Sequence, residues 1–240
     1  MTFRQRLVPL FLSPWCVPTL AVLGLLLFPG EAFAHGVPEG DAGYIQATSG
    51  VLPGPFAYLG AKHMVTGYDH LLFLLGIIFF LYRRKDIALY VSLFAVGHSV
   101  TLIAGVLTGF SVSAYLIDAI IGLSVAYKAL DNLGAFRSWL GWQPDARAAT
   151  LIFGLFHGLG LATKILEFDV APDGLFANLV AFNVGVEIGQ ILALSAILIA
   201  MGAWRRTASF SRYAYSANVA LMSAGFVLTG YQLAGYLVYN

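Results

Sequence analysis

Residues 63–80 read His63-Met64-Val65-Thr66-Gly67-Tyr68-Asp69-His70-Leu71-Leu72-Phe73-Leu74-Leu75-Gly76-Ile77-Ile78-Phe79-Phe80. Two imidazoles and one carboxylate therefore precede a hydrocarbon run of the kind that forms membrane helices. An ionised group near the centre of a bilayer costs at least about 2.5–3.5 kcal/mol on insertion scales, so such groups are usually paired, hydrated or bound to an ion. The stretch predicts a membrane helix whose polar start meets partners on other helices.

The composition is that of an integral membrane protein. Of the 240 residues, 59% are hydrophobic and 10% are charged, and the mean hydropathy is +0.81. A soluble domain carries about 25% charged residues. The net charge is only +1, without the clustered basic surplus that binds nucleic acid. We therefore expect membrane lipids around the protein and no nucleic-acid partner.

The first 34 residues are typical of an export signal. Two arginines precede the apolar run Leu20–Phe28, and Ala32-Phe33-Ala34 offers a cleavage site. Cleavage removes Cys16, the only cysteine, so the mature chain has no thiolate ligand. The alternative is an uncleaved additional helix, which three prolines disfavour. Residues 35–55, rich in glycine and proline, then form an exported loop.

Residues 56–240 contain six apolar segments, each at least as long as the roughly 20 residues that a helix needs to cross a bilayer. They lie near residues 57–82, 87–109, 113–133, 147–167, 177–203 and 214–238. The first contains Gly60 and Gly67, which favours a tilted or re-entrant piece before Tyr68. The predicted fold is all-α: a polytopic membrane bundle of six transmembrane helices after a cleaved N-terminal signal peptide.

The basic residues predict the orientation, because cytoplasmic loops retain Lys and Arg. Nine of them flank the loops that follow the first, third and fifth predicted helices: Arg83, Arg84, Lys85, Lys128, Arg137, Arg147, Arg205, Arg206 and Arg212. Only Lys62 and Lys164 fall on the other side. We expect a multi-pass protein of the bacterial inner membrane, with the N-terminus of the mature chain and the C-terminus both in the periplasm.

Four histidines and two carboxylates share one range of depth in the predicted bundle, at about 1.5 Å rise per residue. They are His63, Asp69 and His70 on the first helix, His98 on the second, His157 on the fourth and Glu187 on the fifth. Imidazole suits nickel, cobalt, copper and zinc, and carboxylates complete such a site without sulfur. The pattern predicts an intramembrane site for a divalent transition-metal ion.

Within the first helix, His63 and His70 are seven residues apart and share one face. Asp69 is turned from His70 by about 100°, so we expect it to orient a histidine on another helix. The alternative is a hydrogen-bonded helix start capped by Asp69, with no ion. For His98, a hydrogen-bonded core histidine is an equally open reading.

Four further residues are weaker candidates for the metal site. Asn183 and Gln190 form one polar stripe with Glu187, which either faces the site or only bonds neighbouring helices. Asp118 lies in the outer part of the third helix, at site depth or near the headgroups. His35 becomes the first residue after signal cleavage, and its amine and imidazole can then chelate one Cu or Ni ion, unless it is incidental.

Four motifs occur in order along the chain. They are Gly60-x-x-His63-x-x-Thr66-Gly67-Tyr68-Asp69-His70, Gly97-His98-Ser99-x-Thr101-Leu102, Phe156-His157-Gly158-Leu159-Gly160-Leu161-Ala162 and Phe182-Asn183-x-Gly185-Val186-Glu187-x-Gly189-Gln190. Together they resemble the HupE/UreJ family of hydrogenase and urease accessory permeases, in particular its second, divergent branch. The resemblance covers about residues 35–200. It implies a small inner-membrane nickel or cobalt permease in which these motifs carry transport.

We expect a permease for a nickel- or cobalt-type divalent cation rather than an enzyme, with copper and zinc as further candidate ions. The sequence has no G-x-x-x-x-G-K-[ST] motif, so a gradient or the membrane potential would drive uptake. Two alternatives use the same residues: a membrane-embedded metal-dependent hydrolase, and a metal-binding accessory subunit without transport. A homo-oligomer or partners in metalloenzyme maturation are open possibilities.

Overall fold

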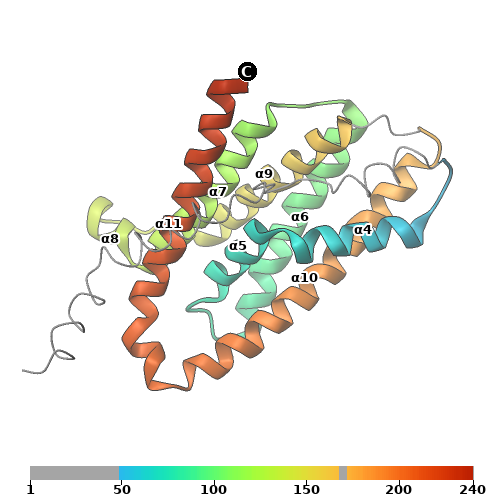
Figure 1. The fold of residues 1–240 in the computed structure, drawn as a ribbon. Coiled ribbons are helices and arrows are strands. Elements are labelled where there is room, and N and C mark those ends of the chain that lie inside the picture. The colour runs from blue at the N-terminus through green and yellow to red at the C-terminus, as the bar shows by residue number, and fades with distance from the viewer. Residues whose placement is uncertain (1–48, 168–171, 240) are drawn as a thin grey trace, which may run out of the picture.

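The computed structural model describes residues 49–167 and 172–239. The predicted signal peptide, His35 and most of the predicted exported loop lie outside the described residues. The described chain is all-helical, which confirms the all-α part of the predicted fold (Figure 1). Its helices are α4 (Pro53–Thr66), α5 (Tyr68–Ile78), α6 (Arg84–Thr108), α7 (Ala114–Asn132), α8 (Ala135–Leu140), α9 (Ala146–Leu166), α10 (Leu175–Arg205) and α11 (Ala208–Tyr239).

Four of these helices, α6, α9, α10 and α11, are long and apolar enough to cross a membrane. The other two predicted spans do not meet these criteria of length and apolar composition. α7 has 19 residues but carries Asp118, Lys128 and Asp131. The first predicted span is divided into α4, with 14 residues, and α5, with 11. The protein is thus a membrane protein by the length and composition of four helices.

The division between α4 and α5 falls at Gly67, which is extended (φ −70°, ψ 102°). Its N–H donates to the His63 carbonyl at 2.9 Å, and its own carbonyl accepts from the Leu71 N–H at 3.1 Å. A Cβ at this position would lie 2.5 Å from His70 Nδ1, so there is no room for a side chain. The break brings the His63 and His70 rings to a centroid distance of 5.0 Å.

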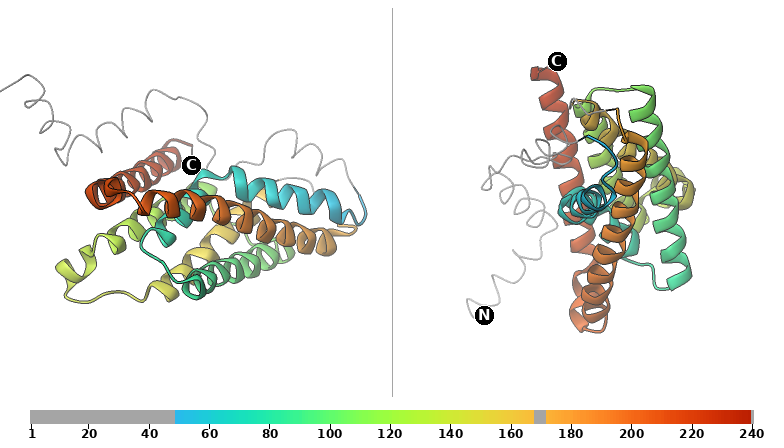
Figure 2. Two further views of the ribbon diagram at one scale, coloured as in Figure 1. Left: turned by 90° about the horizontal axis from the view of Figure 1, so that it is seen from below. Right: turned by 90° about the vertical axis from the view of Figure 1, so that its right-hand side faces the viewer.

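Three helix pairs form the bundle: α4 with α10, α6 with α9, and α7 with α11. Figures 1 and 2 show α4 lying along the first half of α10. Glycines stand at the closest approaches, where the Phe182 carbonyl meets Gly60, the His98 carbonyl meets Gly158 and the Ala57 carbonyl meets Gly185. Small residues permit this close approach of backbones.

The short helix α5 lies among the others and contacts α4, α6, α7, α10 and α11. Its carbonyl end is bonded by side chains of two other helices, because the last carbonyls of a helix have no partner within it. Asn132 Nδ2 donates to the Gly76 carbonyl at 2.8 Å. The Arg205 guanidinium donates to the carbonyls of Ile78 and Phe79. We call this end of the bundle, where α5 and α10 finish and Arg83 to Lys85 follow, the basic end.

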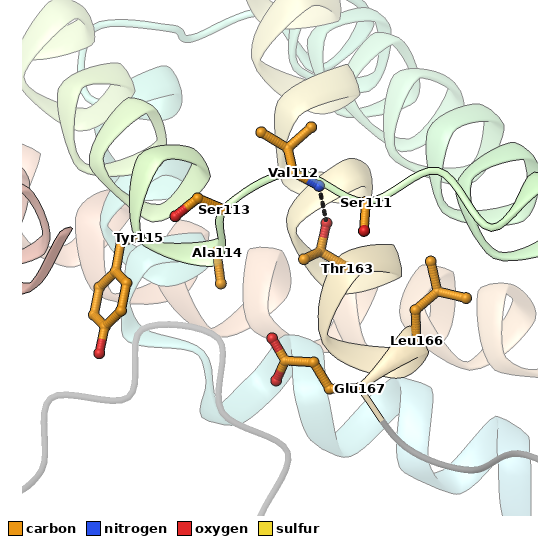
Figure 3. Close-up of a pocket in the computed structure, with 8 residues that line it drawn as sticks. All are labelled: Ser111, Val112, Ser113, Ala114, Tyr115, Thr163, Leu166 and Glu167. Carbon is orange, nitrogen blue, oxygen red and sulfur yellow. Dashed lines mark hydrogen bonds between the residues drawn. The ribbon is translucent and has the colours of Figure 1, made fainter. Parts of the chain in front are cut away.

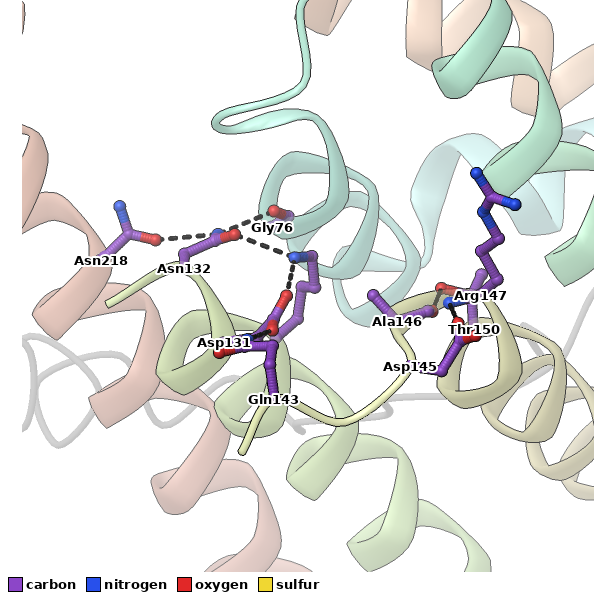
Figure 4. A network of polar contacts seen from close by, with 10 residues as sticks. Gly76, Asp131, Asn132, Gln143, Asp145, Ala146, Arg147, Thr150 and Asn218 are labelled. Carbon is purple, nitrogen blue, oxygen red and sulfur yellow. Dashed lines mark hydrogen bonds and ion pairs between the residues drawn. The ribbon is translucent and has the colours of Figure 1, made fainter. Parts of the chain in front are cut away.

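A polar network that includes the buried Lys128 and Asn218 lies at the basic end (Figure 4). Lys128, 8% exposed, contacts the Asp131 carboxylate and donates to Asn132 Oδ1 at 2.9 Å. Asn132 also donates to Asn218 Oδ1 at 3.0 Å, and Gln143 donates to Asp131. The network ties α5, α7 and α11 to the segment before α9.

Candidate metal centre

Four helices bring their histidines together in the interior. One ring nitrogen each of His63, His70 and His98 lies within 4.8 Å of the other two. Ligand atoms of Asp69, His70 and His157 also lie within 4.8 Å of one another. His70 belongs to both groups, so it stands at the middle of the cluster, which we call the His/Asp cluster. Its members come from α4, α5, α6 and α9.

The cluster is shielded from solvent and walled by aromatic rings. His63 is half-buried, and His70, His98, His157 and Asp69 are at most 1% exposed. The ring of Phe94 lies 4.8 Å from that of His157 and 6.2 Å from those of His70 and His98, between centroids. In such apolar surroundings a charge interacts strongly with its neighbours, which favours a bound cation over separate ionised groups.

Asp69 differs in one respect from its prediction. Its Oδ1 lies 3.3 Å from Nδ1 of the adjacent His70, whereas regular helix geometry turns such neighbours apart. The cause is the break, because both side chains stand in the first turn of α5 and fold over Gly67. Asp69 also meets His157 of α9, so the predicted approach to a histidine on another helix is present.

The protonation of His157 follows from its hydrogen bond. Its Nδ1 lies 2.7 Å from the Phe153 carbonyl oxygen, which can only accept. Nδ1 therefore carries a proton, and Nε2 is the nitrogen left with a lone pair in the neutral ring. A backbone partner of this kind orients an imidazole for binding a metal ion.

The polar stripe of α10 is divided. Asn183 and Gln190 are buried, and their amide groups donate to the Leu179 and Val91 carbonyls at 2.9 and 3.5 Å. Their oxygens, Oδ1 and Oε1, are buried without a hydrogen-bond partner among the described residues. Glu187 is exposed and joins neither metal-binding group of the described chain. It is turned about 60° from Gln190 around the helix axis.

Asp118 is placed apart from the histidines. It is 5% exposed, and its Oδ2 lies 2.8 Å from Lys164 Nζ of α9. Lys164 and the aromatic wall were not foreseen as parts of the site region. The signal for Lys164 was available, since it follows His157 by seven residues and so shares its helix face. Tyr68, inside the first motif, also has a buried hydroxyl without a hydrogen-bond partner in the described chain.

The fold and the cluster define a helical membrane protein with histidines and a carboxylate grouped inside its bundle. Residues 39–240 match the family described as HupE / UreJ protein. The chain therefore belongs to the HupE/UreJ family, as its motifs predicted. This family is associated with nickel or cobalt accessory and transport roles. Neither the curated proteins nor the solved structures gave a significant match.

Proposed function

We propose that this protein is a permease for a divalent transition-metal ion in the bacterial inner membrane, with nickel as the first candidate cargo. The observation that supports this is the His/Asp cluster, whose ligand atoms converge from four helices. Atoms that all bind one ion at about 2.1 Å lie at most about 4.2 Å apart. Within each group of three residues the separations are at most 4.8 Å, so small side-chain rotations can close that group on an ion and open it again.

The chemistry of the cluster suits a cargo that binds and leaves. A divalent cation displaces protons from imidazole, because only the neutral ring binds a metal. Asp69 offsets part of the cation's charge, and the remaining ligands are neutral. A site with one carboxylate holds the ion less tightly than one with several, which favours release.

The broken helix supports transport in particular. In many transporters the substrate site lies where a membrane helix is interrupted. Here the interruption at Gly67 separates His63 from Asp69 and His70. We infer that α4 and α5 together make one crossing, with α6, α7, α9, α10 and α11 as the other five. The basic end then faces the cytoplasm, and both ends of the mature chain face the periplasm.

Nickel binding and nickel flux test the proposal separately. We would measure Ni²⁺ affinity of the purified full chain with a competing indicator dye, and flux into proteoliposomes with the same dye enclosed. His70→Ala should weaken binding by more than the roughly 10–100-fold that loss of an outer-shell partner costs. Ser124→Ala is the matched control, since Ser124 is buried in α7, donates to the Ile121 carbonyl and belongs to neither metal-binding group.

Each outcome has a distinct meaning. Binding and flux in the wild type, both lost in His70→Ala and kept in Ser124→Ala, support the permease. Binding without flux identifies a metal-binding accessory protein instead. A wild type that binds none of Ni²⁺, Co²⁺, Cu²⁺ or Zn²⁺ rejects the cluster as a metal site.

A further inference from the structure

A second set of charged side chains continues from the His/Asp cluster along α9. Lys164 follows His157 by seven residues, and Glu167 follows Lys164 by three, so the three lie on one face of the helix. At about 1.5 Å per residue, Lys164 stands about 10 Å from His157, away from the basic end. Lys164 pairs with Asp118 of α7 at 2.8 Å, and the side chains are 12% and 5% exposed.

A cavity of about 440 Å³ opens between the α6–α7 connection and the end of α9, the end at which Lys164 stands. Its lining includes Glu167 and the hydroxyl-bearing residues Ser111, Ser113 and Thr163. Figure 3 shows the Glu167 carboxylate directed toward the space beside Tyr115. The lining therefore offers oxygen atoms and one acidic group, which is the chemistry that attracts a cation.

Packing is tight on the side of the ion pair that faces His157. Below it, toward His157, α7 and α9 are in close contact: a Cβ at Gly160 would lie 2.8 Å from Ile117 Cγ2 and 3.3 Å from Ile121 Cδ1. On the other side, Leu166 and Glu167, which follow Lys164 in the chain, line the cavity. A movement of the Lys164 side chain away from the histidines therefore brings it toward the cavity.

We propose that Asp118 is a transit site for the divalent cation on its way from the cavity to the His/Asp cluster, and that Lys164 controls access to this site. The proposal rests on the proposed function. In the observed arrangement the Lys164 ammonium holds the place of the cation. Glu167 offers it a second partner, because residues three apart are neighbours on a helix. When a cation arrives, Lys164 moves to Glu167 and Asp118 receives the cation.

The exchange makes entry depend on the cation itself. A buried carboxylate that loses its partner is left with a large desolvation cost, so Lys164 does not leave Asp118 unless another positive charge replaces it. The closed pair also presents a positive group to an ion in the cavity and slows its approach. Asp118 and Lys164 therefore control the rate of entry, while the histidines determine the final affinity.

The rate of Ni²⁺ capture by the purified chain tests this assignment. Lys164→Met keeps the length of the side chain and removes its charge, so capture should be at least about tenfold faster. Lys164→Arg should restore the slow rate. Glu167→Gln should slow capture further, with the equilibrium affinity of the cluster within about twofold of wild type, since the loss acts on entry alone. Equal capture rates in wild type, Lys164→Met and Glu167→Gln would overturn the proposal.

A second measurement separates this proposal from the proposed function. In the His70→Ala background, Lys164→Met should create a weak Ni²⁺ site, because Asp118 then lacks its ammonium. Adding Asp118→Asn should abolish that site and restore neutrality at the pair. Failure of the wild type to bind Ni²⁺ counts against the proposed function, whereas absence of the weak site in a folded Lys164→Met, His70→Ala protein counts against Asp118 as a transit site.

Discussion

Replacing Gly67 with alanine tests whether the break between α4 and α5 positions the metal-binding side chains. The added Cβ would lie 2.5 Å from His70 Nδ1 and 3.1 Å from both Asp69 Oδ1 and the His63 carbonyl oxygen. Comfortable non-bonded contacts begin near about 3.5 Å, so the His70 ring has to move by about 1 Å. In enzymes, a misplacement of about 1 Å at a site that needs fixed geometry lowers the reaction rate about 100-fold, and we expect a loss of similar size in metal affinity.

We therefore expect Gly67→Ala to bind Ni²⁺ about 10–100-fold more weakly than wild type, measured with the competing indicator dye. Gly202→Ala is the matched control, because a Cβ at Gly202 of α10 meets nothing within 4 Å. Its affinity should be unchanged. Thermal unfolding of both variants checks the fold, since overpacking costs about 1–3 kcal/mol. Wild-type affinity in Gly67→Ala would refute the link between the break and the cluster.

Three further predictions concern the α5 end and the stripe of α10. Arg205→Ala should lower the melting temperature by several degrees, because hydrogen bonds from a charged donor to the Ile78 and Phe79 carbonyls are worth about 1.5–3 kcal/mol each. The guanidinium also lies 4.4 Å from the Tyr82 ring centroid, and this contact is lost as well. Arg206→Ala is the control. Asn132→Leu should destabilise the protein by about 1–3 kcal/mol in chemical denaturation, since the Gly76 carbonyl loses its donor, and a stability equal to wild type would contradict the network. Gln190→Met should keep or raise the melting temperature, because it removes a buried oxygen without a partner in the described chain. Nickel flux through the variant should fall. Unchanged flux would mean that this oxygen has no part in transport.

The sequence predicted the parts of the fold that depend on apolar length alone. The second predicted helix, residues 87–109, corresponds to α6 at Arg84–Thr108, and the fourth, residues 147–167, to α9 at Ala146–Leu166. These limits follow from the change between hydrocarbon and polar residues. The break at Gly67 was foreseen only as a tilted or re-entrant piece, because its position depends on how tightly His70 and Asp69 pack against the backbone.

The sequence predicted the depth of the site residues along their helices but not the rotation of each helix about its axis. Histidines at one depth converge because isolated polar groups inside a membrane are costly, and four of them do so here. Glu187 shares their depth and still faces outward. A turn of about 60° around the helix axis separates it from Gln190. Which of the two side chains faces inward depends on the rotation of α10. That rotation is fixed by α4, whose backbone at Ala57 and Ala61 packs against Gly185 and Gly189. Such contacts between helices are absent from the pattern of a single helix.

Under the permease proposal, the polar groups on either side of α5 indicate the route from the cluster toward the basic end. On the side of α7 and α11, the buried Lys128 ammonium, held by Asp131 and Asn132, repels a cation. On the side of α6 and α10, Gln190 reaches the Val91 carbonyl, seven residues before His98 and so about 10 Å nearer the basic end. The Gln190 oxygen, which is buried without a hydrogen-bond partner in the described residues, belongs to the side chain that reaches α6. If the protein is a permease, a cation leaving the histidines would meet the Gln190 oxygen beside α6 and a positive charge between α7 and α11, so we expect the exit on the α6–α10 side.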